Sequence, residues 1–243
     1  MNPIEYPELL EIPDHLSGCT DWHGHMPFAF YAMARHKPKL FVELGVYRGD
    51  SYFTFCQGAK NLYPHPKCIG IDTFGSDPRV ADVMQYGVSP ETYEHIVEKN
   101  IPYRLFSIIH KARFQDVLPS VEDGSIDLLH IDGDHAYHSV RRDFETWKPK
   151  LSNRGIVLFH DIALEQPGQM GAREFWSEII ESYPYFEFYH SYGLGILGVG
   201  KDSLSFIEDL HSPDPQEVRS FFEAAANHIM VFDVARDKLA HVD

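Results

Sequence analysis

Hydrophobic residues along the chain gather in short runs, and each run ends beside a glycine or an ionisable residue. Four runs have this form: Leu40–Leu44, Cys68–Ile71, Ile126–Ile131 and Gly155–Phe159. Short runs that are mostly apolar, without polar alternation, are typical of parallel strands that are covered on both faces. We therefore predict that these four runs are strands of one parallel sheet.

Between the predicted strands, apolar residues follow helical spacing. Val140, Phe144 and Trp147 recur at i, i+4 and i+7 and make one apolar stripe, and Pro149 then marks the end of that helix. A second helix is predicted over Ser51–Ala59, directly after a glycine. The alternation of strand and helix is typical of an α/β domain.

The pattern changes at Tyr185, where two extended stretches are joined by the turn SYG. This predicts an antiparallel hairpin over Tyr185–Gly200 at the end of the sheet. Two amphipathic helical stretches follow, Ser203–Leu210 and Gln216–Ala226. The whole order predicts a single doubly wound α/β domain with a mostly parallel sheet. We expect three parts: an N-terminal lid or helical extension (1–38), the core (39–201) and a C-terminal helical extension (202–243).

The composition narrows the classes of function. With 44% hydrophobic and 23% charged residues, the chain of 243 residues has the make-up of an ordinary globular protein. Its formal net charge of −15 disfavours nucleic acid and anionic membranes as partners, because both repel an acidic surface. The N-terminal sequence lacks the pattern of a signal peptide, and no apolar run approaches the roughly 20 residues of a membrane span. Three scattered cysteines fit a reducing compartment, so we expect a cytoplasmic protein.

A glycine-containing loop, VELGVYRGDS, follows the first predicted strand at Val42–Ser51. In an open parallel sheet, ligands bind beyond the carboxyl ends of the strands, which places this loop at the expected site. Gly45 and Gly49 are four apart, and Tyr47 stands where a dinucleotide fingerprint would have its second glycine. Glu43 adds negative charge where a diphosphate would lie. Both features disfavour an NAD or nucleotide-sugar enzyme.

The E-x-G-x-x-x-G loop, the strand end GIDTF and the closing hairpin together resemble the class I S-adenosylmethionine-dependent methyltransferases. The resemblance implies a seven-stranded Rossmann-like sheet and S-adenosylmethionine as cofactor, whose sulfonium and ammonium groups suit an acidic neighbour. It also implies that Asp72 binds the ribose hydroxyls, that Phe74 stacks on the adenine and that Asp116 accepts from its amino group. A turn-capping role for Asp72 stays open. The cofactor-binding residues implied in this way are Glu43, Gly45, Gly49, Ser51, Asp72, Thr73, Phe74 and Asp116.

Two further motifs narrow the resemblance: I-D-G-x-H at Ile131–His135 and F-H-D at Phe159–Asp161. They resemble those of small-molecule and sugar O-methyltransferases, among them enzymes that tailor glycans and antibiotics. The resemblance implies O-methylation of a sugar or another small polar acceptor. N-methylation and a homo-oligomer stay open. So does a function of a different class, a noncatalytic S-adenosylmethionine-binding module of a glycan-assembly system.

Ionisable residues at the last two parallel strand ends form a candidate metal site. Asp132 and Asp161 are expected to lie side by side, because their strands are predicted neighbours. Together with His160 they would bind a divalent cation, Mg²⁺ or Mn²⁺. Metal-dependent relatives have a carboxylate or an amide where this chain has His160, so the presence of the cation stays open. A turn-capping role is the structural alternative for Asp132.

His135 is the expected general base, because the unperturbed pKa of histidine, about 6.5, suits removal of a hydroxyl proton near neutral pH. Asp134 is the rival candidate and His160 is the third. His130, inside a predicted strand, is interpreted as a packed core histidine. The segment Cys19–Phe30 is expected either to cover the site as a lid or to pack on the sheet.

Overall fold

The computed structural model describes residues 5, 10–76, 90–164 and 171–240. Its centre is a seven-stranded sheet in the order β3-β2-β1-β4-β5-β7-β6. The first five strands are parallel, whereas β7 runs antiparallel to both β5 and β6. The predicted doubly wound sheet with a closing antiparallel hairpin is thereby confirmed. The strands are β1 (Leu40–Leu44), β2 (Lys67–Asp72), β3 (Ser107–Lys111), β4 (Ile126–Ile131), β5 (Leu151–His160), β6 (Tyr185–Phe188) and β7 (Leu194–Gly198).

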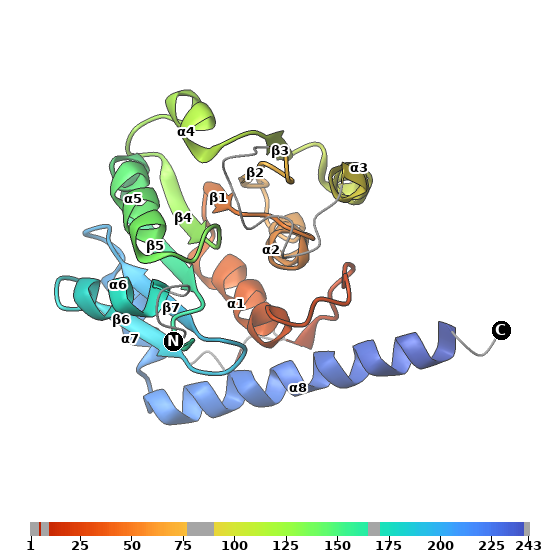
Figure 1. Cartoon of the computed structure of the whole chain (residues 1–243). Helices are drawn as coiled ribbons and strands as arrows, with labels where there is room; N and C mark the ends of the chain where they lie inside the picture. Colours follow the sequence, from red (N-terminus) through yellow and green to blue (C-terminus); the bar gives the residue numbers. More distant parts are fainter. Residues whose placement is uncertain (1–4, 6–9, 77–89, 165–170, 241–243) are drawn as a thin grey trace.

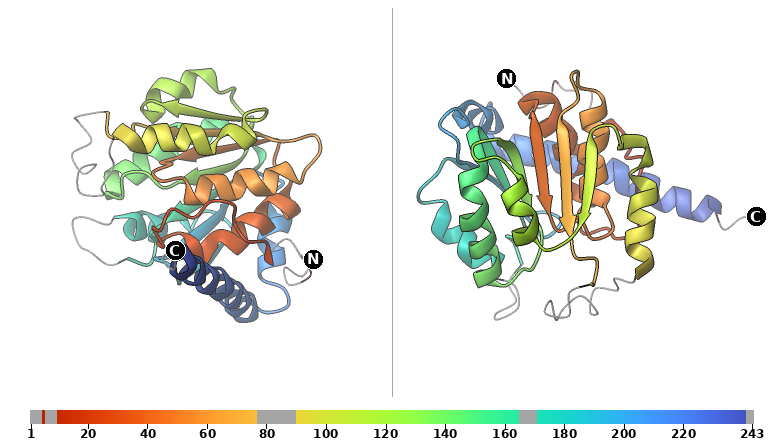
Figure 2. Two further views of the ribbon diagram at one scale, coloured as in Figure 1. Left: turned by 90° about the vertical axis from the view of Figure 1, so that its right-hand side faces the viewer. Right: turned by 90° about the horizontal axis from the view of Figure 1, so that it is seen from above.

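Helices cover both faces of the sheet, as Figure 1 and Figure 2 show. One face packs against α1 (Met26–His36), α2 (Asp50–Lys60), α3 (Pro90–Lys99), α7 (Leu204–Leu210) and α8 (Pro215–Ala240). The other face packs against α4 (Phe114–Val117), α5 (Tyr137–Trp147) and α6 (Ala172–Ile179). Short 3-10 turns join these elements: η3 (His23–His25), η4 (Ile101–Tyr103), η5 (Leu118–Ser120) and η6 (Lys148–Lys150). Two separate apolar cores therefore hold the sheet, one on each side.

The predicted elements agree with the structure, with differences at their ends. α5 ends at Trp147, and its apolar stripe is buried against the sheet. β5 begins at Leu151 rather than at Gly155. The added residues are polar, but Leu151 pairs with Ile126 across an irregularity in the register, and this pairing extends the strand.

The C-terminal helix α8 is longer than predicted and runs from Pro215 to Ala240. The apolar stripe that includes Val218 and Phe222 continues past the predicted end at Ala226, since Ile229 is also buried. The first part of α8 packs on α1 and η3, and its far end extends beyond the body of the molecule (Figure 1). Among the described helices, none combines the length and hydrophobicity needed to cross a lipid bilayer.

Candidate active site

Polar side chains replace apolar ones at the carboxyl ends of the central strands. Glu43 of β1 and His130 of β4 are register partners, so their side chains point to the same face of the sheet. His160 ends β5 on this face as well, two positions beyond Leu158, which is the register partner of His130. Glu43, His130 and His160 are all buried. On the side of the sheet that packs against α1 and α2, the side chains are therefore apolar in the middle of the strands and ionisable at their carboxyl ends.

Glu43 is fully enclosed and makes two hydrogen bonds. Ser51 Oγ donates to Oε1 at 2.8 Å, and Nδ1 of His130 lies 2.9 Å from Oε2. Burial raises the pKa of Glu43, and the charge and hydrogen bond of His130 offset part of that rise. In this structure the carboxylate joins β1, β4 and α2, and its predicted role at the cofactor stays a prediction.

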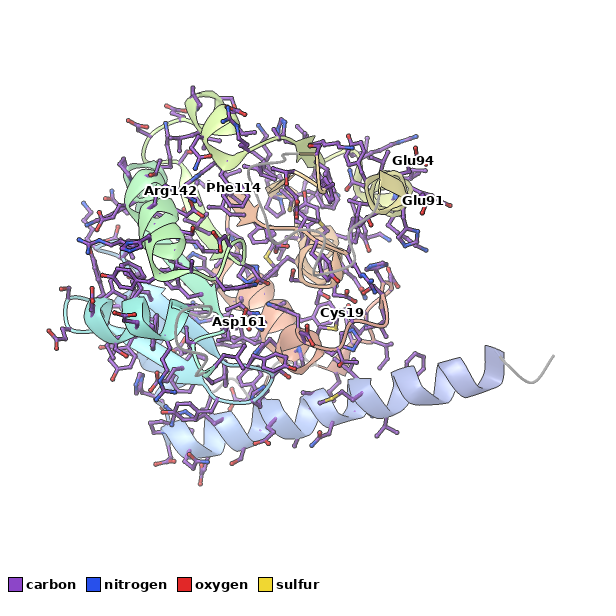
Figure 3. The ribbon with its side chains drawn as sticks, viewed as in Figure 1. Cys19, Glu91, Glu94, Phe114, Arg142 and Asp161 are labelled. Atoms are coloured by element: carbon purple, nitrogen blue, oxygen red, sulfur yellow. The ribbon has the colours of Figure 1, made fainter. Side chains whose placement is uncertain are left out.

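Two aspartates and two histidines alternate beyond the ends of β4 and β5. Nδ1 of His160 lies 3.3 Å from Oδ1 of Asp132 and 3.4 Å from Oδ1 of Asp161. Oδ2 of Asp161 lies 2.8 Å from Nδ1 of His135. Figure 3 shows Asp161 near the middle of the molecule, whereas Glu91 and Glu94 lie on the outer helix α3. The structure thus brings together residues from two neighbouring strand ends.

The charges in this cluster support one another. Burial acts to raise the pKa of Asp132 and of Asp161, but the adjacent histidines outweigh it and lower both pKa values. Burial likewise acts to lower the pKa of His160 and of His135, but the adjacent aspartates outweigh it and raise both. The cluster therefore favours carboxylates paired with imidazolium groups. A bound cation would displace these protons, because metal ligands must be deprotonated.

The donor set of this cluster suits a divalent cation. Among the described residues, Asp132, His135 and Asp161 each offer a ligand atom that lies within 4.8 Å of the other two. Carboxylate oxygens suit Mg²⁺ and Mn²⁺, and imidazole widens the choice of metal. His160, expected as a ligand, instead directs Nδ1 at both carboxylates, while Nε2 donates to the carbonyl of Ser191 at 3.1 Å. His160 therefore contacts the two aspartates and the turn before β7 at the same time.

The segment before α1 covers the cluster. The ring of Trp22 is buried, with its centroid 5.4 Å from that of His130 and 6.5 Å from that of His160. His25 packs on His160 at 5.5 Å and donates from Nε2 to the carbonyl of Ser191 at 3.0 Å. Three buried nitrogens here have no hydrogen-bond partner among the described residues: Trp22 Nε1, His25 Nδ1 and His130 Nε2. Unsatisfied buried groups are rare in proteins, and their concentration marks this layer as part of a site.

The loop after β1 is held in place by Asp72 at the end of β2. Oδ2 of Asp72 accepts the backbone N–H groups of Val46 at 2.9 Å and Tyr47 at 2.8 Å. Oδ1 accepts the N–H of Phe74 at 2.7 Å. Burial raises the pKa of Asp72, and these backbone donors work against the rise. Asp72 therefore shapes the loop that the sequence predicts as a ligand-binding element.

Gly45 lets this loop pass directly over the end of β4. A Cβ at position 45 would lie 2.0 Å from the carbonyl oxygen of Asp132, and the residue has a φ of +95°. Both the space and the backbone conformation therefore require glycine. Gly49, with a φ of +87°, begins α2 in the same left-handed region. The glycines of the motif thus fix how β1, α2 and β4 meet at the site.

Comparison with known proteins agrees with this geometry. The methyltransferase domain family matches residues 42–162, from β1 to just beyond β5. This region is a methyltransferase domain of the class I S-adenosylmethionine-dependent type. This confirms the family that the sequence motifs resemble.

Two solved structures share the fold of this methyltransferase. A putative caffeoyl-CoA O-methyltransferase from Staphylococcus aureus has a TM-score of 0.55 at 15% identity and covers 71% of this chain and 81% of its own. The SAH-bound methyltransferase PaMTH1 of Podospora anserina has a TM-score of 0.54 at 16% identity and covers 72% of this chain and 77% of its own. At these identities the likeness concerns the fold alone.

Two curated relatives are more similar in sequence to parts of the methyltransferase. An uncharacterised protein of Sinorhizobium fredii is 38% identical over 193 residues, which are 79% of this chain. An uncharacterised protein of Acanthamoeba polyphaga mimivirus is 28% identical over 127 residues, which are 50% of this chain. The chain spans 21% of the length of the first relative and 50% of the second.

The predicted cofactor-binding residues of the methyltransferase differ in accessibility. Asp72 and Thr73 are partly exposed beside the loop, whereas Ser51 is buried against Glu43. Phe74 is only 2% exposed, and its ring lies 5.1 Å from that of Tyr93. In the structure its ring belongs to the core on the α2 side of the sheet. The adenine-stacking role of Phe74 stays a prediction.

Asp116 lies on the surface of the methyltransferase, in the short helix α4. Its carboxylate accepts from Nε and Nη2 of Arg113, at 2.7 Å and 2.6 Å. The side chain of Asp116 is 48% exposed. The carboxylate of Asp116 thus already has a cationic neighbour, Arg113. Its contact with the adenine amino group stays a prediction.

The sequence interpretation of His130 as a packed core histidine captures its burial but misses its pairing with Glu43 across 87 residues. A signal for this pair was present in the sequence. Glu43 and His130 each stand second from the end of a mostly apolar run, LFVEL and IDLLHI. A polar residue at the same place in two predicted neighbouring strands indicates a contact between them.

Proposed function

We propose that this methyltransferase transfers a methyl group from S-adenosylmethionine to a hydroxyl group of a sugar or another small polar acceptor, with the help of a divalent cation. The observation that carries the proposal is the convergence of Asp132, His135 and Asp161 beyond the ends of β4 and β5. In a doubly wound sheet, this edge is where ligands bind. Two solved structures with this fold are named as O-methyltransferases, and this supports the choice of oxygen as the acceptor atom.

The residues around the β1–α2 loop suit the cofactor. Oδ2 of Asp72 already accepts two backbone N–H groups, but Oδ1 accepts one and retains capacity for a ribose hydroxyl. Thr73 lies next to it and is partly exposed. We assign the loop Gly45–Gly49, Asp72 and Thr73 to the cofactor, with Asp116 at the adenine end. Bound S-adenosylmethionine supplies an electrophilic methyl group on a positively charged sulfur.

Asp132 and Asp161 are the residues assigned to the cation. Their pKa values are low, so both are ionised at neutral pH and need no proton loss before binding. A divalent cation there would supply Lewis acidity that lowers the pKa of a nearby hydroxyl group. His160 contacts both carboxylates and keeps them facing each other. These contacts orient the acceptor site relative to the sheet.

His135 is assigned as the general base. Its Nδ1 donates to Asp161 at 2.8 Å, and this bond directs the ring so that Nε2 is the nitrogen that accepts the acceptor proton. The carboxylate of Asp161 also stabilises the imidazolium that results, as in a His–Asp pair of a catalytic triad. The rival Asp134 accepts from the N–H of Ala136 and from Oγ of Ser139 at 2.5 Å, so its carboxylate serves the start of α5.

The first test is product formation. Purified protein is incubated with S-adenosylmethionine and a panel of sugars, with Mg²⁺, with Mn²⁺ or after exhaustive chelation, and released S-adenosylhomocysteine is measured. We expect release that depends on the acceptor, disappears after chelation and returns with added cation. Full activity of metal-free protein would remove the cation from the proposal. Cofactor binding without turnover on any acceptor would instead favour the noncatalytic module.

The second test separates the base from its rival. His135→Ala should lose about 10²–10⁴-fold in turnover, the usual contribution of a general base, while cofactor affinity stays near that of the wild type. Asp134→Asn is the matched control, because it removes a neighbouring charge and leaves His135 in place. A loss below tenfold in His135→Ala with a large loss in Asp134→Asn would transfer the role to Asp134. Loss of Mn²⁺ binding in His135→Ala would make His135 a ligand.

A further inference from the structure

We propose that Glu43 and His130 form a positioning pair that fixes the carboxylate of Asp132 in the orientation needed to bind the cation. The inference rests on the proposed function, because it concerns the cation site assigned to Asp132 and Asp161. It gives a purpose to two buried ionisable residues that the proposed chemistry does not use. The pair would act through Asp132, without touching the acceptor or the cofactor.

The sheet places the three residues in one line. Glu43 and His130 are register partners on neighbouring parallel strands, and Asp132 lies two residues beyond His130, directly after the end of β4. Because side chains alternate between the faces of a strand, His130 and Asp132 share the face to which Glu43 also points. Nδ1 of His130 lies 2.9 Å from Oε2 of Glu43, and Nε2 lies 3.9 Å from Oδ2 of Asp132.

The bond to Glu43 determines which ring nitrogen faces Asp132. With Nδ1 engaged by Glu43, the imidazole ring has a fixed orientation, and Nε2 points at Asp132. The distance of 3.9 Å is longer than a hydrogen bond but short enough for Nε2 to limit how far the carboxylate can turn. Nε2 has no hydrogen-bond partner among the described residues, so no other described group competes with Asp132 for it.

Asp132 is held from two sides as a result. Oδ1 faces His160 at 3.3 Å, and Oδ2 faces His130 at 3.9 Å. A rotation of the carboxylate away from Asp161 would lose both contacts. Residues that orient metal-binding carboxylates in this way commonly affect metal affinity as strongly as 10–100-fold when they are replaced.

The surroundings keep the pair rigid. Glu43 and His130 are both 0% exposed, and Ser51 holds the second oxygen of Glu43. Trp22 covers the ring of His130, with centroids 5.4 Å apart. Two ionisable side chains cost free energy to bury, which makes a purely structural role for them unfavourable compared with apolar residues. Their position behind a candidate ligand explains why the core carries them.

The test compares two replacements of His130, each of which places a polar group near one of the two ring nitrogens. His130→Asn retains a polar group near Nδ1, facing Glu43, and removes the one near Nε2. His130→Gln retains a polar group near Nε2, facing Asp132. Mn²⁺ affinity is measured by calorimetry on the full chain, together with the thermal midpoint. We expect His130→Asn to lose about 10–100-fold in Mn²⁺ affinity, and His130→Gln, which keeps the group facing Asp132 but not the bond to Glu43, to lose less.

His36→Asn is the matched control. His36 is also buried and bonded through one ring nitrogen, which donates to the carbonyl of Asp127 at 2.9 Å, but it lies at the opposite end of β4. This variant should lower the thermal midpoint and leave Mn²⁺ affinity unchanged. Should His130→Asn fail to fold, Glu43→Gln tests the pair from its other end, because it keeps the shape and weakens the charge that orients the ring.

The outcomes distinguish failure of the positioning pair from failure of the cation site. Mn²⁺ binding by the wild type with equal affinity in His130→Asn, His130→Gln and Glu43→Gln would overturn the positioning pair and leave the cation site intact. Equal loss in the Asn and Gln variants would also overturn it, since the lost affinity would not depend on the group near Nε2. No Mn²⁺ binding by the wild type would overturn both the cation site and the pair.

Discussion

The strand β4 carries an aspartate at each end, and the two have opposite surroundings. Near its start, Asp127 accepts the N–H of Lys39 at 2.7 Å and Oγ of Ser152 at 2.5 Å, with Arg154 3.8 Å away. Beyond its end, the partners of the Asp132 carboxylate among the described residues are the ring nitrogens of two histidines, at 3.3 Å and 3.9 Å. One carboxylate is satisfied by short bonds, and the other is oriented by two longer contacts and keeps capacity for a further ligand.

This difference shows how burial and function can be separated within one element. Both carboxylates lie close to the core, so neither can be assigned a role from burial alone. What distinguishes them is the donor set, because backbone N–H and hydroxyl donors are permanent partners. Histidines can give way to a cation by losing a proton. The amino end of β4 is thus expected to govern stability, and the carboxyl end activity.

The largest effect is expected at the carboxyl end. Asp132→Asn should reduce turnover about 10³-fold, because a cation contributes several kcal/mol to stabilising the transition state. Its free energy of unfolding should fall by less than that of Asp127→Ala, since the replacement keeps the shape and Asp161 stays beside His160. The measurements are S-adenosylhomocysteine release and urea unfolding. A loss of turnover below tenfold would show that the carboxyl end of β4 does not govern activity.

The amino end should respond in the opposite way. Asp127→Ala should lower the free energy of unfolding by about 2–4 kcal/mol, because it leaves the N–H of Lys39 and the hydroxyl of Ser152 without their acceptor. Turnover per folded molecule should stay within about twofold of the wild type. The control is Asp123→Ala, which removes an ion pair from a side chain that is 74% exposed. That variant should be nearly neutral.

A smaller, pH-dependent effect is expected from His36, which bonds to the backbone of Asp127. Burial lowers the pKa of His36 to about 4, from an ordinary value of 6.5. Between these values the unfolded chain binds more protons than the folded protein, so the wild type loses stability as the pH falls from about 6.5 towards 4. His36→Asn lacks this loss. The difference in free energy of unfolding between the wild type and His36→Asn should therefore shrink by about 1–2 kcal/mol between pH 7.5 and pH 5.

Urea unfolding of both proteins at several pH values gives this comparison. A difference that stays constant over the range would mean that His36 does not titrate differently in the folded and unfolded states. The pH profile of Asp123→Ala provides a reference, because that variant changes an exposed side chain and keeps both His36 and the cluster at the carboxyl end.

Much of the fold could be predicted from local patterns. The apolar runs identified the four predicted strands, and the spacing of Val140, Phe144 and Trp147 identified α5. The hairpin followed from its SYG turn. These features depend on neighbours in the sequence, so one chain was enough to find them. The start of β5 was missed because its added residues are polar and join the sheet only through pairing with β4.

The site was less predictable because its contacts join distant residues. The ionisable residues at the strand ends were visible in the sequence, but their partners were not. The pairing of Glu43 with His130 depends on the register of β1 against β4, which no local pattern reveals. In the same way, Asp72 was expected to face the cofactor, and its bonds to the N–H groups of Val46 and Tyr47 require the folded loop.

The cover over the site depends on the smallest side chain in η3. A Cβ at Gly24 would lie 2.0 Å from Oγ of Ser191, so a methyl group there would separate η3 from the turn before β7. Water entering the gap would raise the local dielectric constant around Asp132. Two unit charges 4 Å apart attract by about 4 kcal/mol at an effective dielectric constant of 20, but by about 1 kcal/mol in water. The absence of a side chain at Gly24, far from β4 in the sequence, thus keeps water away from the ionic contacts beneath Trp22 and keeps them strong.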